Sequence, residues 1–179
     1  MQFEGAFRVP GRPEEVIAKF ADVERMARCM PGASIEGRDE EGNYLGAMTV
    51  AFGPKRIRFR GKMACQFDLV HCSGILRGRG AADLRAARIE VRTAFKVSLD
   101  TEADPGAPYS IVSLTSEADL QGVLADFART GGAAVGNILM EDFAKNLAAE
   151  FSQGDGSGDA SEAIPAHKIV WRAIKAKLT

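Results

Sequence analysis

The sequence contains few histidines and cysteines, the side chains that hold most zinc sites. Its 179 residues include two histidines, His71 and His167, and three cysteines that form no CxxC pair. An odd number of cysteines without that spacing argues against a disulfide framework and a thiolate metal site. There is no HExxH sequence either, so we expect no metal site. We interpret Cys29, Cys65 and Cys72 as buried thiols rather than reactive nucleophiles.

Long hydrophobic runs and a strong net charge are also missing. No apolar stretch approaches the eighteen or so residues of a membrane span. The first fifteen residues lack the basic start and apolar core of a signal peptide, so we expect a cytoplasmic protein. A net charge of −1 gives no general affinity for nucleic acid. With 46% hydrophobic and 26% charged residues, the chain has the composition of one globular domain.

The first part of the chain combines one strand pattern with two helix patterns. Residues 3–9 alternate apolar and polar side chains, which is the period of a strand with one solvated face, and Pro10 ends the pattern. Pro13 followed by two glutamates favours a helix start, and Asp22 is suited to cap a second helix that ends at Cys29. We therefore predict two short helices after the first strand.

Residues 35–120 predict a series of antiparallel strands separated by turns. In the clearest, residues 57–69, apolar side chains occupy one face and mostly charged or polar side chains the other. Glycines inside strands weaken pairing but permit sharp bending. The glycines at such positions are Gly61, Gly74, Gly78 and Gly80. We expect a sheet that curls and is covered on one side.

Residues 121–151 predict one long helix. Apolar and small residues recur there at steps of three and four, which places them on one helix face. They are Leu124, Phe127, Ala128, Gly131, Val135, Ile138, Leu139, Phe143, Leu147 and Phe151. The inner side of the strands is the other large apolar surface. We therefore predict an α+β domain over residues 1–151, in which a curved antiparallel sheet of about seven strands grips this helix.

The C-terminal part of the chain has a different composition. Residues 152–163 are typical of a flexible linker. Residues 164–179 have four basic and no acidic side chains, in the pattern of a basic amphipathic helix. The residues expected to contact a membrane or partner are Lys168, Val170, Trp171, Arg172, Ile174, Lys175 and Leu178. Such a tail lies on an anionic membrane, docks on a partner protein or folds back on its own domain.

Four short motifs occur in order along residues 1–151. They are Asp22 with the CMPGA sequence at 29–33, Phe52-Gly53-Pro54 with Phe59 and Gly61, Gly78-x-Gly80-Ala81, and Gly122-x-x-Ala125. Together they resemble the CoxG family of carbon monoxide dehydrogenase proteins, a branch of the START-like, helix-grip superfamily. One position departs from the family pattern, because Ala128 stands where the family usually has glycine.

This resemblance implies a helix-grip fold with an apolar cavity between sheet and helix. It implies a quinone or lipid ligand, no covalent cofactor, and association with a molybdenum hydroxylase of the carbon monoxide dehydrogenase type. We expect a non-catalytic accessory protein, peripheral on the inner face of the cell membrane. An alternative is a maturation or assembly factor whose tail docks on a protein. A START-like cyclase would require a polar pair inside the cavity.

The predicted cavity lining is apolar and comes from both the strands and the long helix. Its residues are Phe52, Phe59, Met63, Phe67, Ile89, Val91, Phe95, Leu124, Phe127, Val135 and Leu139. Side chains of this kind hold lipids and quinones, although the same residues are also suited to fill a solid core.

Other candidate sites are weaker. His71 lies beside Cys72, but adjacent strand residues point to opposite faces, so the two do not form a catalytic pair. Glycines at 131, 132 and 136 lack the Gly-Lys-Ser/Thr ending of a phosphate loop. We interpret them as residues that let the helix lie close to the sheet or bend there. Arginines on the strands predict a solvated outer face, or a basic patch for an acidic partner.

Overall fold

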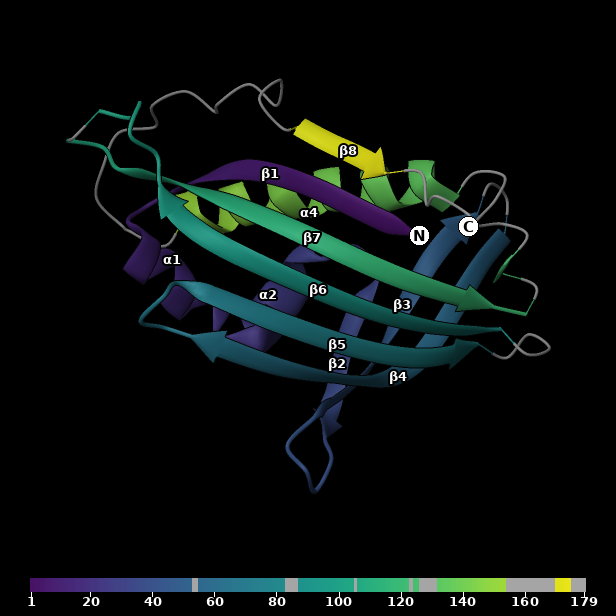
Figure 1. Cartoon of the computed structure of the whole chain (residues 1–179). Coiled ribbons are helices and arrows are strands. Elements are labelled where there is room, and N and C mark those ends of the chain that lie inside the picture. Colours follow the sequence, from purple (N-terminus) through teal and green to yellow (C-terminus); the bar gives the residue numbers. More distant parts are fainter. Residues whose placement is uncertain are drawn as a thin grey trace.

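The computed structural model describes residues 1–52, 55–82, 87–104, 106–122, 124–125, 132–153 and 170–174. At positions 52, 55, 132, 133, 152, 153 and 170–174 it describes the backbone only. In this part of the chain, eight strands form one antiparallel sheet in the order β2-β3-β4-β5-β6-β7-β1-β8 (Figure 1).

The order of the elements follows the sequence prediction closely. The strands are β1 (Gln2–Pro10), β2 (Ala33–Arg38), β3 (Tyr44–Phe52), β4 (Lys55–Asp68), β5 (Ser73–Ala82), β6 (Arg88–Leu99), β7 (Tyr109–Gln121) and β8 (Val170–Ile174). The helices are α1 (Pro13–Phe20), α2 (Val23–Cys29) and α4 (Gly132–Gln153). Seven strands around a C-terminal helix, with two short helices after β1, confirm the predicted helix-grip fold.

The starts of both short helices follow from their sequences. In α1, Pro13 occupies the first turn, and the Glu15 carboxylate accepts a hydrogen bond of 3.1 Å from the backbone N–H of Arg12. In α2, the Asp22 carboxylate accepts from the backbone N–H of Arg25, also at 3.1 Å. The predicted cap at Asp22 is therefore confirmed.

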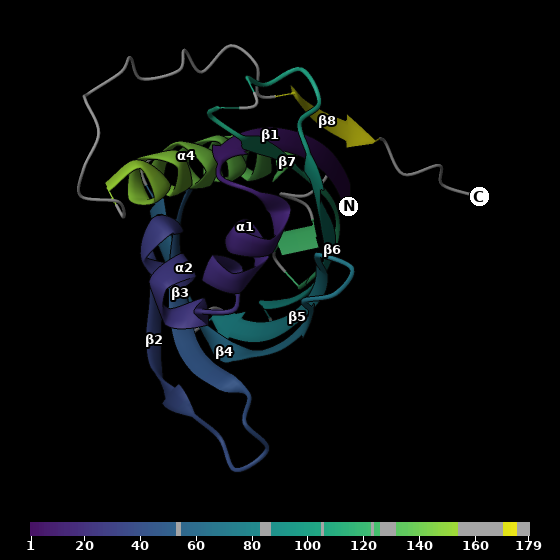
Figure 2. The same cartoon turned by 90° about the vertical axis from the view of Figure 1, so that its left-hand side faces the viewer.

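The sheet curls around α4, and α1 and α2 lie at one end of the enclosed interior (Figure 2). Glycine makes part of this curl possible. Gly61 of β4 faces Gly46 of β3 and Gly80 of β5 across the ladder. A Cβ on Gly61 would lie 2.0 Å from the carbonyl oxygen of Arg79, so no other residue fits this close approach.

Helix α4 is held to α2 by specific contacts. Its Asn146 side chain donates a hydrogen bond of 3.0 Å to the carbonyl oxygen of Cys29, at the end of α2. The Arg25 guanidinium of α2 contacts the Glu150 carboxylate at 2.6 Å. These two contacts therefore fix the C-terminal half of α4 against α2.

The predicted helix over 121–151 is wrong at its start. β7 continues to Gln121, which pairs with Arg88 of β6, and Gly122 then turns the chain with a φ of +67°. Ladder pairing with β6 therefore overrides the helical periodicity at Gln121. Leu124 and Ala125 are helical, and α4 runs from Gly132 to Gln153, two residues into the predicted linker. Ala128 and Gly131 lie outside the described residues.

The predicted tail helix is wrong for Val170–Ile174. These residues form β8, which pairs antiparallel with β1 from Gln2–Ile174 to Ala6–Val170. Without β8, this side of β1 would be a free sheet edge with unpaired backbone groups, and an edge of this kind readily accepts another strand. β-branched and aromatic residues in β8 also favour a strand. The rest of the predicted linker and tail lies outside the described residues.

Candidate ligand-binding site

The inward-facing side chains of the described residues form two separate apolar clusters. The first lies at the end of the interior covered by α1 and includes Phe7, Ile17, Phe20, Leu114 and Leu147. The second lies around Leu124 and includes Val50, Phe59 and Ala87. Because the described residues form two clusters rather than one continuous core, the middle of the interior decides whether a ligand has room.

Five of the eleven predicted lining residues lie in or against the second cluster. Phe59 and Leu124 are buried there, and Ile89, Val135 and Leu139 pack against them. These five residues come from β4, β6, α4 and the segment after β7. The structure therefore brings together residues that are up to eighty positions apart in the sequence.

Phe67 and Phe95 lie instead against the first cluster. Their ring centroids are 6.2 Å apart, and the Phe95 ring lies 5.4 Å from that of Phe20 on α1. Edge-to-face contacts of this kind are typical of packed aromatic cores. These two residues close one end of the interior rather than lining a single pocket with Phe59.

Met63 and Val91 belong to neither cluster and lie on opposite sides of Gly78. The ladder pairs Met63 with Gly78, and Gly78 with Val91, so all three positions face the concave side. A Cβ on Gly78 would meet no described atom within 4 Å. Among the described residues, the space in front of this glycine is open. Of the remaining predicted lining residues, the Phe52 side chain and all of Phe127 lie outside the described part.

Sequence reasoning missed a polar pair on the same concave face. The hydroxyl oxygens of Thr93 on β6 and Ser116 on β7 are 2.8 Å apart, and the two residues are direct cross-strand partners. Thr93 stands between Val91 and Phe95 in the strand alternation, so its inward position was readable from the sequence. Its pairing with Ser116 required the register of β6 and β7.

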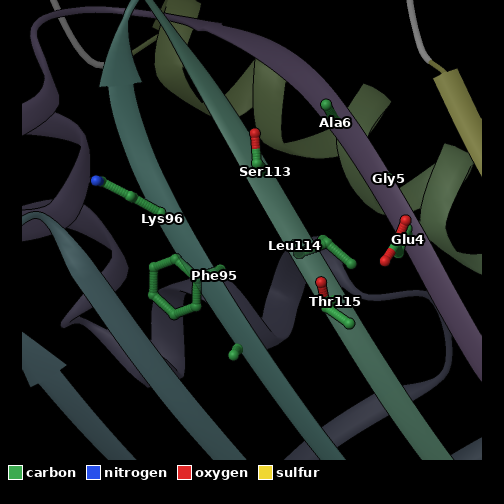
Figure 3. Close-up of a pocket in the computed structure, with 9 residues that line it drawn as sticks. Glu4, Gly5, Ala6, Phe95, Lys96, Ser113, Leu114 and Thr115 are labelled. Atoms are coloured by element: carbon green, nitrogen blue, oxygen red, sulfur yellow. The ribbon is translucent and has the colours of Figure 1, made fainter.

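In the described part of the chain, two hollows lie outside this interior. The larger, with a volume of about 570 Å³, is on the solvent-facing side of β1, β6 and β7 (Figure 3). Small and polar side chains, among them Ala6, Ser113 and Thr115, surround it, and Phe95 is its one residue from the predicted lining. The other, about 320 Å³, lies between α2 and β2. Neither matches the predicted cavity.

The titratable side chains do not form a catalytic arrangement in the described part of the chain. In the turn after β4, Nδ1 of His71 lies 2.7 Å from Oδ2 of Asp68, and the His71 side chain is 77% exposed. Burial raises the pKa of all three cysteine thiols, that of Cys65 to about 11. Cys29 and Cys72 are buried, as predicted, and Cys65 is half-buried.

The described residues were also compared with the expectations for a metal site, a membrane span and the tail contacts. They contain no group of three or more histidine, cysteine, aspartate or glutamate side chains placed to hold a metal ion. No helix among them is long and apolar enough to cross a membrane. Of the predicted tail contacts, Val170, Trp171, Arg172 and Ile174 lie in β8. The others, Lys168, Lys175 and Leu178, lie outside the described part.

Comparison with known proteins identifies both a family and a fold. Residues 5–154 match the family profile of CoxG, a subunit of carbon monoxide dehydrogenase. No curated protein matches the chain significantly. A conserved protein from Geobacillus kaustophilus is 17% identical, with a TM-score of 0.71 over 86% of this chain and 96% of its own. The Zhui aromatase/cyclase from Streptomyces sp. R1128 is 14% identical, with a TM-score of 0.59 over 86% of this chain and 94% of its own. At these identities the two structures show a shared fold.

Proposed function

Because the chain belongs to the CoxG family of carbon monoxide dehydrogenase proteins, we propose that it is a non-catalytic accessory protein that binds an apolar molecule between its sheet and α4. The molecule is a quinone or a lipid. The partner is a molybdenum hydroxylase of the carbon monoxide dehydrogenase type, which the protein associates with the inner face of the cell membrane. The family name supports the partner, and the helix-grip fold supports the ligand site.

The open space in front of Gly78 carries the ligand proposal. Protein interiors are normally close-packed, and a strand residue inside a solid core has atoms in contact with its Cβ position. Gly78 has no described atom within 4 Å of that position, although it lies between the two apolar clusters. Met63 and Val91 flank the space with apolar side chains. The space therefore suits an apolar ligand.

The concave face supports a binding role rather than catalysis. From Ile57 on, the described inward-facing positions of β4, β5, β6 and β7 are apolar, glycine or hydroxyl residues, together with the thiol of Cys65. These positions carry no carboxylate, imidazole or amine for general acid–base catalysis. Cys65 is a poor general base, because burial raises the pKa of its thiol to about 11 and the thiol stays protonated at neutral pH.

Filling the open space tests the ligand site. We would measure binding of decylubiquinone by competition with the fluorescent apolar probe N-phenyl-1-naphthylamine. Gly78→Leu, and separately Val91→Phe from the neighbouring strand, should weaken binding roughly tenfold because both side chains occupy the space. The matched control is Ala81→Leu, whose exposed side chain lies on the opposite face of β5.

The melting temperature of each variant shows whether it remains folded. Native mass spectrometry of the purified protein would identify a molecule that copurifies with it. Wild-type protein that binds neither probe, or folded space-filling variants that bind as well as the wild type, would contradict the ligand proposal.

A second candidate is a maturation or assembly factor whose tail docks on the hydroxylase. In β8 the tail folds back on its own domain, and docking on the hydroxylase would use the same backbone pairing with a strand edge of the partner. Two measurements on the full chain and on a chain ending at Ala163 separate the candidates. Loss of hydroxylase copurification on truncation supports docking, whereas loss of flotation with anionic vesicles supports a membrane tether.

A further inference from the structure

The hydroxyl pair of Thr93 and Ser116 lies at the boundary between the two apolar clusters. On β6, Thr93 follows Val91 and Ile89 along the concave face, and Ile89 packs in the second cluster. On the other side of Thr93, Phe95 packs against the first. Both hydroxyl residues are half-buried. The pair therefore borders the open space that we propose for the ligand.

Ser116 has the same position on β7. Leu114, two residues before it, is buried in the first cluster, whereas Leu120, four residues after it, packs against the second. Leu76 and Phe3 flank the pair in the same cross-strand row. Apolar groups thus surround the only hydrogen-bonded side-chain pair that the described residues place on the concave face of β6 and β7.

This pair has spare hydrogen-bonding capacity. Each hydroxyl has one hydrogen and two lone pairs, and one hydroxyl donates to the other across the 2.8 Å contact. The accepting hydroxyl keeps its own hydrogen. Among the described residues, neither Thr93 nor Ser116 has a second side-chain hydrogen-bond partner. A donor left unpaired among apolar groups is unfavourable, so an acceptor on a ligand would complete the pair.

We propose that Thr93 and Ser116 form the polar anchor of the ligand site and donate one hydrogen bond to a carbonyl oxygen of an otherwise apolar molecule. This inference rests on the proposed function. No charged side chain occupies the neighbouring inward positions of β5, β6 and β7, so a neutral carbonyl suits the site better than an ionic headgroup. A quinone ring and the ester of a neutral lipid both present such an oxygen.

Three probes separate the carbonyl from the apolar surface. Decylubiquinone has ring carbonyls, dioctanoylglycerol has ester carbonyls, and decylbenzene has a similar alkyl chain without an oxygen. The double variant Thr93→Val with Ser116→Ala removes both hydroxyls and keeps similar side-chain sizes. It should weaken binding of at least one carbonyl probe about tenfold, and leave decylbenzene binding unchanged or stronger.

The matched control places the same two substitutions on the outer face. Ser113→Ala with Thr115→Val alters exposed residues of β7 that line the hollow in Figure 3. Binding of all three probes should remain unchanged. Which carbonyl probe loses affinity in the Thr93/Ser116 variant identifies the quinone or the ester as the source of the oxygen.

The outcomes distinguish this inference from the proposed function. If the Thr93→Val/Ser116→Ala variant lost affinity equally for decylbenzene and both carbonyl probes, the pair would only support the fold. This result would overturn the proposed anchor. Unchanged carbonyl binding in the folded variant would also overturn it while leaving the ligand site intact. Failure of the wild-type protein to bind any of the three probes would overturn the proposed function itself.

Discussion

Phe3 of β1 occupies the space that a side chain on Gly136 of α4 would need. A Cβ at position 136 would lie 2.6 Å from Cε1 of the Phe3 ring, well inside contact distance. Phe3 is also the cross-strand partner of Ser116. The close approach of α4 to β1 at Gly136 therefore lies in the same cross-strand row as the hydroxyl pair. It supports the interpretation that this glycine lets the helix lie close to the sheet.

Substitution of Gly136 tests this contact. Overpacking typically costs about 1–3 kcal/mol, whereas alanine favours a helix over glycine by about 1 kcal/mol. We expect Gly136→Ala to lower the free energy of unfolding by up to about 2 kcal/mol, measured by urea denaturation. With Phe3→Leu, which frees space at the contact, the same substitution should become neutral or stabilising. An equal effect in both backgrounds would contradict the contact.

The thiol of Cys65 reports on the concave face. It lies in the cross-strand row of Leu76 and Thr93, and burial raises its pKa from 9.0 to about 11. Because the thiolate is the reactive form, alkylation by iodoacetamide at pH 8 should be about 100-fold slower than for a free thiol. Peptide mass spectrometry would measure the rate.

A bound ligand should slow alkylation of Cys65 further, because both occupy the concave side of the sheet. Decylubiquinone is the probe, and wild-type protein without a probe is the reference. Alkylation of Cys65 at the rate of a free thiol would show that this side chain is not buried as described.

Asp39 in the turn between β2 and β3 gives a pH prediction. Its carboxylate accepts hydrogen bonds from the Asn43 side chain, which has the largest effect, and from Lys62, and they lower its pKa from 3.8 to about 2. Because the folded pKa is the lower one, the stabilisation is complete above about pH 4 and is lost as the pH falls toward 2.

Side-chain NMR titration would measure this pKa directly. Asn43→Ala should move the Asp39 pKa toward 3.8, and Lys62→Met should move it in the same direction by less. A pKa that stays near 2 in the Asn43→Ala variant would contradict the assigned cause.

The pairing of β8 with β1 predicts a change in hydrogen exchange. In an antiparallel strand, alternate backbone N–H groups point to each neighbour, so β1 keeps its bonds to β7 when β8 is removed. In a chain that ends at Gln153, about half of the amides of residues 2–6 should exchange faster, measured by mass spectrometry. Residues 33–38, on the opposite sheet edge, are the control and should not change. Identical exchange of residues 2–6 in both chains would contradict the pairing.

Local sequence was sufficient for most of the fold. The alternation in residues 57–69 predicts the buried side of β4 correctly, because each pleat places successive side chains on opposite faces. Asp22 and Pro13 predict the starts of two helices, since a cap or a first-turn proline acts within a few residues. Ile89 and Leu139 pack against the cluster that contains Phe59, because strand and helix periodicity selects the buried face.

The remaining features depend on contacts that are distant in sequence. Gln121 lies in β7 because the ladder with β6 extends to it, and Val170–Ile174 form a strand because the edge of β1 accepts one. Neither partner is visible in the local pattern.

By itself, the sequence determined the class of the fold, its family and the apolar character of its concave face, because these depend on periodicity and short motifs. Only the tertiary structure decided that the apolar residues divide into two clusters, that the space at Gly78 lies between them, and that Thr93 meets Ser116 there. The physical reason is strand register. It sets which side chains share a row across the sheet, and where a glycine leaves that row unfilled.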